Sequence, residues 1–447
     1  MSQAPLPEDR PEGEIVETRP TPDDGGDPKH DPYAAWRVRS FALFAIGGFF
    51  ANVGSQMQSV AVGWELYERT GSAMSLGWVG LAQGLPIMLF ALIGGQVADR
   101  WDRRWLVMGA QLVMIGCSLR LAWISHHWEM LAKVSDAAPV WLVYETLFLN
   151  GAARAFGWPA GAALLPLLVS KKTFSNAVTW RSTVFQVAAV SGPAVGGWLI
   201  AFHHSATVVY LADAALTLTY FLFITFIRSP RVERSSETPS FGSLTAGFRY
   251  LGQNKVVLAA IALDLFAVLL GAADSLLPIF AKDILHVGPQ ELGWLRAAPA
   301  VGAFVMAITI AHQPPFRHAG RALLWAVAGF GVVTIVFGVS HWFWLSMLML
   351  AFSGALDNVS VVIRHSLVQL RTPDAMRGRV SAVNSIFISS SNDLGGFRAG
   401  AMAQAFGPVI SVVAGGIGTI LVALAAAKLW PEIRKLGKLH EEEKRSS

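Results

Sequence analysis

Several ionisable side chains lie inside long apolar stretches of this sequence, where charges are otherwise rare. The acids are Glu145, Asp213, Asp264, Asp274, Asp357 and Asp393, and the bases are Arg120, Arg154, Arg181, Arg296, Arg364 and Arg398. A charge at membrane depth costs roughly 2.5–3.5 kcal/mol on insertion scales, so such groups face the protein interior or water. Burial favours protonation of a carboxylic acid, whereas a nearby arginine opposes it, and a carboxylate between these two effects can bind and release a proton.

Depth along the apolar stretches separates these groups. Asp357 and Asp393 fall near the middle of their segments, so either could carry a proton across the membrane. The alternative for each charged residue is a permanent ion pair that fixes helix packing. The balance of acids and bases in the apolar segments favours pairing between helices.

Polar side chains in the first apolar segment form a second candidate group. Asn52, Gln56 and Ser59 recur at helical spacing and share one face, whereas Gln58 lies about 200° away from Gln56. Such a face can hydrogen-bond a polar solute. The alternative is polar bonding between neighbouring helices.

The composition indicates a membrane protein that consists of helices. The sequence is 53% hydrophobic and 15% charged, whereas soluble domains carry roughly 25% charged residues. A spanning helix needs roughly 20 apolar residues. Segments that meet this need lie at about 40–66, 72–98, 104–126, 139–168, 173–201, 206–227, 255–281, 290–312, 321–340, 342–369, 380–405 and 408–429. We therefore expect an all-α membrane protein with twelve transmembrane helices.

The longest polar break, 228–254, divides the segments into two six-helix halves. We expect a disordered tail at 1–37, one half at 38–227, a cytoplasmic linker at 228–254, the second half at 255–430 and a tail at 431–447. Transporters are often built as two related halves with a binding site at their interface. The two halves are thus expected to be pseudo-symmetric.

The distribution of basic residues predicts the orientation. Most Lys and Arg residues fall in the tails and in alternate loops, and only Arg69, Lys133 and Lys282 lie in the opposite loops. Short loops rich in Lys and Arg stay in the cytoplasm. We expect a multi-pass protein of the cell inner (plasma) membrane with both termini cytoplasmic. The basic residues behind the net charge of +5 are then explained by the orientation of the chain in the membrane, and they do not indicate nucleic-acid binding.

Motifs for other chemistries are missing from the sequence. Cys117 is the single cysteine, so no disulfide within the chain is possible, and no His or Cys spacing indicates a metal site. The sequence has no phosphate-binding lysine motif for ATP. We expect no cofactor, no metal and no enzymatic activity.

The loop between the second and third segments carries the most informative motif. Gly95-x-x-Ala98-Asp99-Arg100-x-x-Arg103-Arg104 resembles the loop between helices two and three of the major facilitator superfamily. That family usually has Gly where this chain has Asp102. An Asp-Arg-Arg ending is typical of the branch that contains the enterobactin exporter and the macrolide efflux proteins.

Three more runs extend the resemblance over about residues 38–430. Gly192-Pro193-x-x-Gly196-Gly197 is similar to the antiporter motif of helix five, although Val184 and Ala188 replace the glycines expected upstream. Proline bends a helix and glycine opens a flat face, so a packing kink without a transport role is the alternative. The runs from Thr372 to Asn384 and from Ser390 to Gly400 resemble the same branch.

The resemblance implies roles for particular residues. Helices one, four, seven and ten line the central cavity in this superfamily, which favours as site residues Glu145, Arg154, Asp264, Asp274 and Asp357. Asp99 is expected to meet Arg377 at the start of helix eleven when the cytoplasmic face closes. The implied conformational latch comprises Gly95, Asp99, Arg100, Arg103, Arg104 and Arg377.

The resemblance also implies the function. We expect a monomeric exporter that moves a small amphipathic molecule, either siderophore-like or a drug, by alternating access and proton antiport. Its partners are the solute, protons and the lipid bilayer. One alternative is a carrier of lysophospholipids or metabolites with the same fold. Another is a membrane receptor or scaffold that does not transport.

Overall fold

A computed structural model describes residues 31–227, 249–314, 316–435 and 437 of the chain. Every apolar segment expected from the sequence is helical over most of its length. The first half contains α1 (Arg39–Thr70), α2 (Ala73–Arg100), α3 (Arg103–His126), α4 (Trp128–Ala132), α5 (Ala138–Leu168), α6 (Phe174–His203) and α7 (Thr207–Thr225). The second half contains α9 (Lys255–Gly271), η1 (Asp274–Leu276), α10 (Leu277–Ile279), η2 (Phe280–Ile284), α11 (Pro289–Ala311), α12 (Ala319–Val339), α13 (Phe343–Arg371), α14 (Asp374–Phe406), α15 (Pro408–Leu429) and α16 (Pro431–Lys435).

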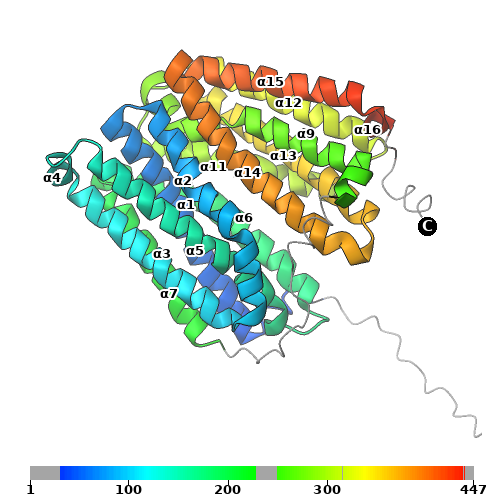
Figure 1. Ribbon diagram of the computed structural model, residues 1–447, viewed down its shortest axis with the longest axis horizontal. Helices are drawn as coiled ribbons and strands as arrows, with labels where there is room; N and C mark the ends of the chain where they lie inside the picture. The colour runs from blue at the N-terminus through cyan, green and yellow to red at the C-terminus, as the bar shows by residue number, and fades with distance from the viewer. Residues whose placement is uncertain (1–30, 228–248, 315, 436, 438–447) are drawn as a thin grey trace, which may run out of the picture.

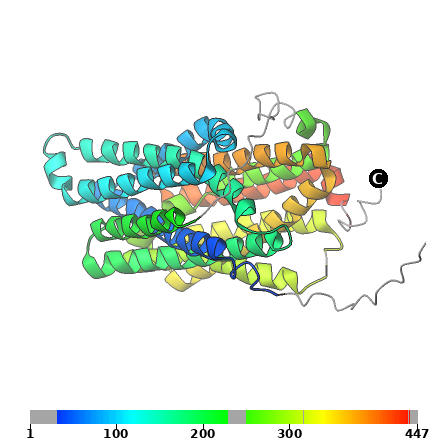
Figure 2. The same ribbon diagram turned by 90° about the horizontal axis from the view of Figure 1, so that it is seen from below.

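The long helices form one bundle, and most of the described turns between them are short. Figures 1 and 2 show these helices running side by side. Gly71 (φ 60°) ends α1, and Gly407 (φ 90°) separates α14 from α15. Positive φ is favourable for glycine, which allows the chain to reverse within one or two residues. The backbone N–H of Arg104 donates to the Asp102 carboxylate at 2.9 Å, which caps the start of α3.

Within the described residues, nine helical segments are long and apolar enough to cross a membrane. Three more helices, α1, α5 and α14, contain 32, 31 and 33 residues but are not among the nine. These three helices carry many of the polar and charged residues identified in the sequence, including Asn52, Arg154 and Asp393. The all-helical membrane fold is therefore confirmed, and the number of twelve spans remains a prediction.

The two halves meet through two pairs of helices. α2 packs against α14, and α6 packs against α11. Figure 1 shows α14 lying along α2 between the two groups of helices. Following the predicted orientation, we call the ends near Gly71 and Gly407 the outer ends and those near Arg100 and Asp374 the inner ends.

Two predicted boundaries were wrong. The disordered tail was expected to reach residue 37, but Trp36 packs on Trp180 of α6 with ring centroids 5.5 Å apart, and Trp180 Nε1 donates to Pro32 O at 2.8 Å. The predicted linker ends too late, because residues 249–253 are helical and Leu251 is buried in the core of the second half. The expected tail over 1–30 and the expected linker over 228–248 lie outside the described residues.

The segment expected as one helix over 255–281 is interrupted. α9 ends at Gly271, and η1 begins at Asp274. Pro278 lacks a backbone N–H and so favours a break in the turn before it. Arg398 of α14 donates to Leu269 O at 3.0 Å and to Leu270 O at 2.5 Å, so two carbonyl groups near the end of α9 are satisfied by a side chain. Interrupted helices of this kind occur at transporter binding sites.

Candidate substrate and coupling site

Asp393 and Arg154 bring opposite charges of the two halves within electrostatic reach of each other. Asp393 lies against Gly84 of α2, and a side chain on Gly84 would overlap the Asp393 carboxylate. Arg154 of α5 lies within electrostatic reach of Asp393. The absence of a side chain at Gly84 therefore leaves the space that allows a carboxylate of α14 to approach the first half.

Arg154 still has hydrogen-bonding capacity. Its guanidinium donates to Ser55 Oγ at 3.2 Å and lies over the Trp158 ring at 5.0 Å. Its Nε is buried and has no hydrogen-bond partner among the described residues. A buried donor without a partner costs roughly 1–3 kcal/mol, and an anionic or phenolic oxygen of a solute would satisfy it.

A second polar contact joins the halves through α1 and α11. Arg296 donates to Ser59 Oγ at 2.7 Å. Arg296 is also within electrostatic reach of Asp274, which begins η1 after the interruption of α9. The face predicted on α1 thus takes part in contact with the other half.

Asp274 and Asp357 line one cavity inside the second half. The cavity has a volume of about 180 Å³, and its other polar lining residues include Ser275, Thr334, Ser353 and Asn392. One water occupies about 30 Å³ in the liquid, so the cavity has room for several. Two carboxylates beside such a space can take up protons from water, as a coupling site requires.

Two sequence candidates lie apart from this region. Asp264 is buried and forms an ion pair with Arg364 of α13, inside the second half. Glu145 was expected to line the central cavity, but it is exposed and pairs with Arg120 of α3 at 2.6 Å. That expectation for Glu145 is corrected, because the face of α5 that carries it opens onto a surface groove beside α2 and α3.

The remaining candidates on α1 are engaged locally. Asn52 Nδ2 donates to Gly48 O of its own helix at 2.6 Å. Gln56 packs where a side chain on Gly192 of α6 would clash with it. The two residues are half-buried.

The glycines of α6 allow close contact on two sides. Gly192 and Gly196 lie against α1, where added Cβ atoms would come within 2.5 Å of Gln56 Cβ and 2.9 Å of Met57 Cα. Gly197 and Pro193 lie against Gly293 of α11, in the other half. α6 continues through Pro193 without interruption.

The loop arginines are anchored within the first half. Arg103 donates to Ala163 O of α5 at 3.1 Å, and Arg104 donates to Ile224 O at 3.1 Å and Thr225 O at 2.6 Å at the end of α7. Cations at a helix carboxyl end satisfy its free carbonyl groups. Arg100 is exposed. The side chains of Asp99 and Arg377 lie outside the described part of the structure, so the latch stays a prediction.

A buried polar cluster was not selected from the sequence. Asp213 of α7 accepts from Gln58 Nε2 at 2.9 Å and from Ser118 Oγ at 2.6 Å, and Asn150 lies 3.5 Å from Gln58 Oε1. The four residues are buried and come from α1, α3, α5 and α7. The sequence did contain a signal for this cluster, because Gln58 and Asp213 both lie within apolar segments, where each needs a hydrogen-bond partner.

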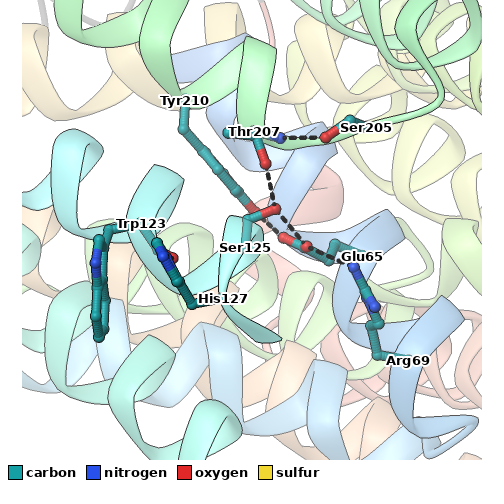
Figure 3. Close-up of polar contacts among 8 residues, drawn as sticks. All are labelled: Glu65, Arg69, Trp123, Ser125, His127, Ser205, Thr207 and Tyr210. Atoms are coloured by element: carbon teal, nitrogen blue, oxygen red, sulfur yellow. Dashed lines mark hydrogen bonds and ion pairs between the residues drawn. The ribbon is translucent and has the colours of Figure 1, made fainter. Parts of the chain in front are cut away.

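A similar cluster at the outer ends surrounds Glu65 (Figure 3). Ser125 Oγ donates to Glu65 Oε1 at 2.6 Å, Tyr210 donates to Oε2 at 2.9 Å, and Arg69 lies 3.9 Å from Oε1. Two residues further along α1, Tyr67 donates to Asp283 of the second half. The Glu65 cluster thus holds together the part of α1 that contacts the other half.

The fold and these polar contacts define a multi-pass membrane transporter built from two halves. A family model described as transmembrane secretion effector matches residues 30–445. The chain belongs to this family of the major facilitator superfamily, whose members are transporters and not enzymes.

Comparisons with known proteins agree with this family. Enterobactin exporters of Shigella boydii serotype 18 and Citrobacter koseri are 24% and 25% identical over 400 residues, which is 89% of this chain and 93% of each relative. A solved nucleoside transporter has a TM-score of 0.67 at 13% identity and covers 88% of this chain and 100% of its own. A bacterial homologue of the iron transporter ferroportin, in an inward-facing state, has a TM-score of 0.67 at 15% identity, with coverage of 88% and 99%.

Proposed function

We propose that this protein is a monomeric secondary exporter of a small amphipathic molecule, either siderophore-like or a drug. Export uses alternating access and proton antiport. The relatives are enterobactin exporters, which favours a solute with phenolic or carboxylate oxygens. The observation that carries the proposal is the buried Nε of Arg154, which has no hydrogen-bond partner among the described residues and lies on a side chain within electrostatic reach of Asp393 of the other half.

The carboxylates that face the second half's cavity and the interface support proton coupling. Asp393 lies within reach of Arg154, and Asp274 lies within reach of Arg296. An anionic solute bound to Arg154 competes with Asp393 for that cation. Asp393 then takes up a proton more readily, which links solute binding to proton binding.

The contacts between the halves support alternating access. Gly77 lies against Gly400, Gly197 against Gly293, and Tyr67 donates to Asp283, all near the outer ends. The predicted latch of Asp99 and Arg377 is at the inner ends. Contact at one end at a time would expose the Arg154 region to one side of the membrane after the other.

Efflux from a host that lacks its own pumps tests the proposal. The panel contains catecholate siderophores, macrolides and cationic dyes, each measured with and without a protonophore. We expect protonophore-sensitive efflux of at least one member, and a strong loss in an Arg154→Gln variant that reaches the membrane in normal amounts. No efflux of any panel member by membrane-inserted protein would contradict the proposed solute class.

A further inference from the structure

A groove lies on the flank of the first half, outside the region of Arg154 and Asp393. It is formed by α2, α3 and α5 and has a volume of about 480 Å³. Its wall is mainly apolar, and Trp78, Leu85, Trp141 and Leu149 are exposed along it. Pockets of roughly 300–1,000 Å³ accommodate small organic ligands.

An ion pair lies within this apolar groove. Arg120 Nη2 and Glu145 Oε2 are 2.6 Å apart, and the two side chains are 34% and 62% exposed, so a ligand can reach the ion pair from the surface. Arg120 precedes the end of α3 at His126 by about 9 Å, given 1.5 Å per residue. In the predicted orientation, Arg120 therefore lies at the depth of the outer leaflet of the bilayer. An open charge pair beside hydrocarbon is unfavourable, and a ligand with charges of its own would relieve that cost.

We propose that this groove binds one outer-leaflet phospholipid with a zwitterionic headgroup that ends in a primary ammonium. The phosphate binds Arg120, because guanidinium groups form paired hydrogen bonds with phosphate oxygens. The ammonium donates to Glu145, and an acyl chain covers the exposed apolar wall. The positive and negative charges of the groove match those of this headgroup. An anionic phospholipid would satisfy Arg120 and be repelled by Glu145.

The groove adjoins a contact between the halves. Trp78 lines the groove and also packs edge-on against Phe397 of α14, with ring centroids 5.1 Å apart. Tyr144, another lining residue, donates to Ser75 O of α2 at 3.1 Å. A bound lipid therefore lies next to the α2–α14 pair, where it can stabilise the arrangement with the outer ends in contact.

Native mass spectrometry of the full-length purified protein tests the proposal. The protein is titrated with phosphatidylethanolamine and phosphatidylglycerol that carry the same acyl chains. We expect one ethanolamine lipid to bind about fivefold more tightly than the glycerol lipid, the size expected for one partly exposed ion pair. Glu145→Gln should remove this preference, because it weakens binding of the ethanolamine lipid and strengthens binding of the glycerol lipid. Arg120→Gln should weaken binding of both lipids.

Arg181→Gln provides the matched control, because Arg181 is an exposed arginine of α6 outside the groove. This variant should keep the preference for the ethanolamine lipid. An unchanged preference in Glu145→Gln, or equal binding of the two lipids by the unmodified protein, would overturn the proposal. If a variant fails to fold, the comparison of the two lipids in the unmodified protein still tests the proposal. Displacement of the lipid by an exported panel compound would assign the groove to the exported solute and also overturn it.

Discussion

At the scale of single residues, the arginines differ in how completely they are satisfied. Arg104 donates to two carbonyl groups at the end of α7. Arg364 pairs with Asp264 inside the second half, although its Nε is buried and has no hydrogen-bond partner among the described residues. Arg154 has a buried Nε without a partner among the described residues. Unsatisfied polar groups cost stability, so their retention at the contact between the halves favours a role in binding.

The Asp264–Arg364 pair is predicted to be structural. Asp264→Asn leaves a buried guanidinium without its counter-ion, which costs about 3–5 kcal/mol, so this variant should accumulate poorly. The double variant Asp264→Leu with Arg364→Met replaces the pair by apolar groups, a change that is often neutral. We expect its amount in the membrane, its melting temperature and its efflux rate to return close to those of the unmodified protein. A folded but inactive double variant would instead place Asp264 in the transport cycle.

The sequence predicted which charges lie in the membrane but not how they pair. Glu145 and Asp393 were both recognised as acids in apolar segments, but Glu145 pairs with Arg120 on the flank and Asp393 lies against Gly84 between the halves. The direction in which each side chain points depends on helix rotation and on residues far away in sequence. Gln58 and Asp213, 155 positions apart, show the same limit.

At the scale of elements, glycines set how closely helices of the two halves approach. A Cβ on Gly293 of α11 would lie 2.5 Å from Pro193 O and 3.2 Å from Gly197 Cα of α6. Both atoms belong to the backbone, so they cannot turn aside as a side chain would. The α6–α11 contact at the outer ends therefore depends on these small residues.

Gly293→Ala is predicted to hinder closure of the outer ends. Overpacking typically costs about 1–3 kcal/mol, and here that cost falls on the closed arrangement, so efflux should drop about tenfold. Gly116→Ala in α3 is the matched control, because nothing lies within 4 Å of the added methyl group. Efflux and melting temperature are measured for both variants. An unchanged efflux rate in Gly293→Ala would show that this contact is not needed for transport.

The inner ends carry the predicted latch. Asp99 lies in the last turn of α2, and Arg377 lies in the first turn of α14. A negative charge near a helix amino terminus contributes about 0.3–1 kcal/mol, so Asp99→Asn should slow efflux about two- to fivefold without lowering the amount of protein.

Asp102→Asn is the control for the latch variant. It removes a neighbouring charge but keeps an oxygen that can cap α3, because Asn and Asp are about equally good at this position. Its efflux rate should stay normal. A normal rate in Asp99→Asn, at normal expression, would remove Asp99 from the latch.

The interruption of α9 was not predictable from hydropathy. The span 256–284 has the highest mean hydropathy among the candidates, 2.5, and so reads as one uninterrupted helix. Its break places Asp274 beside the cavity that Asp357 also lines. Arg398, more than 120 positions away, satisfies the carbonyl groups near the break, and the local sequence does not contain that partner.

At the scale of the whole molecule, the arrangement of apolar segments was predictable because membranes impose it. Backbone groups in hydrocarbon must be satisfied internally, so long apolar runs become helices. The ends of the two halves were less predictable. Trp36 packs on the first half and Leu251 is buried in the core of the second, but the polar sequence around each residue does not indicate this packing. The resemblance of the loop after α2 led to the same superfamily as the family match over residues 30–445.

Proton-driven solute flux in reconstituted vesicles tests the central claim most directly. Vesicles with the protein in its cellular orientation are loaded with the solute that the efflux panel identifies, and the outside is made acidic. We expect faster solute release together with acidification of the interior that depends on the solute. A protonophore, which collapses the pH gradient, should abolish the acceleration of solute release. Solute release that does not respond to the pH gradient, with no proton movement in vesicles that contain the protein, would contradict the central claim.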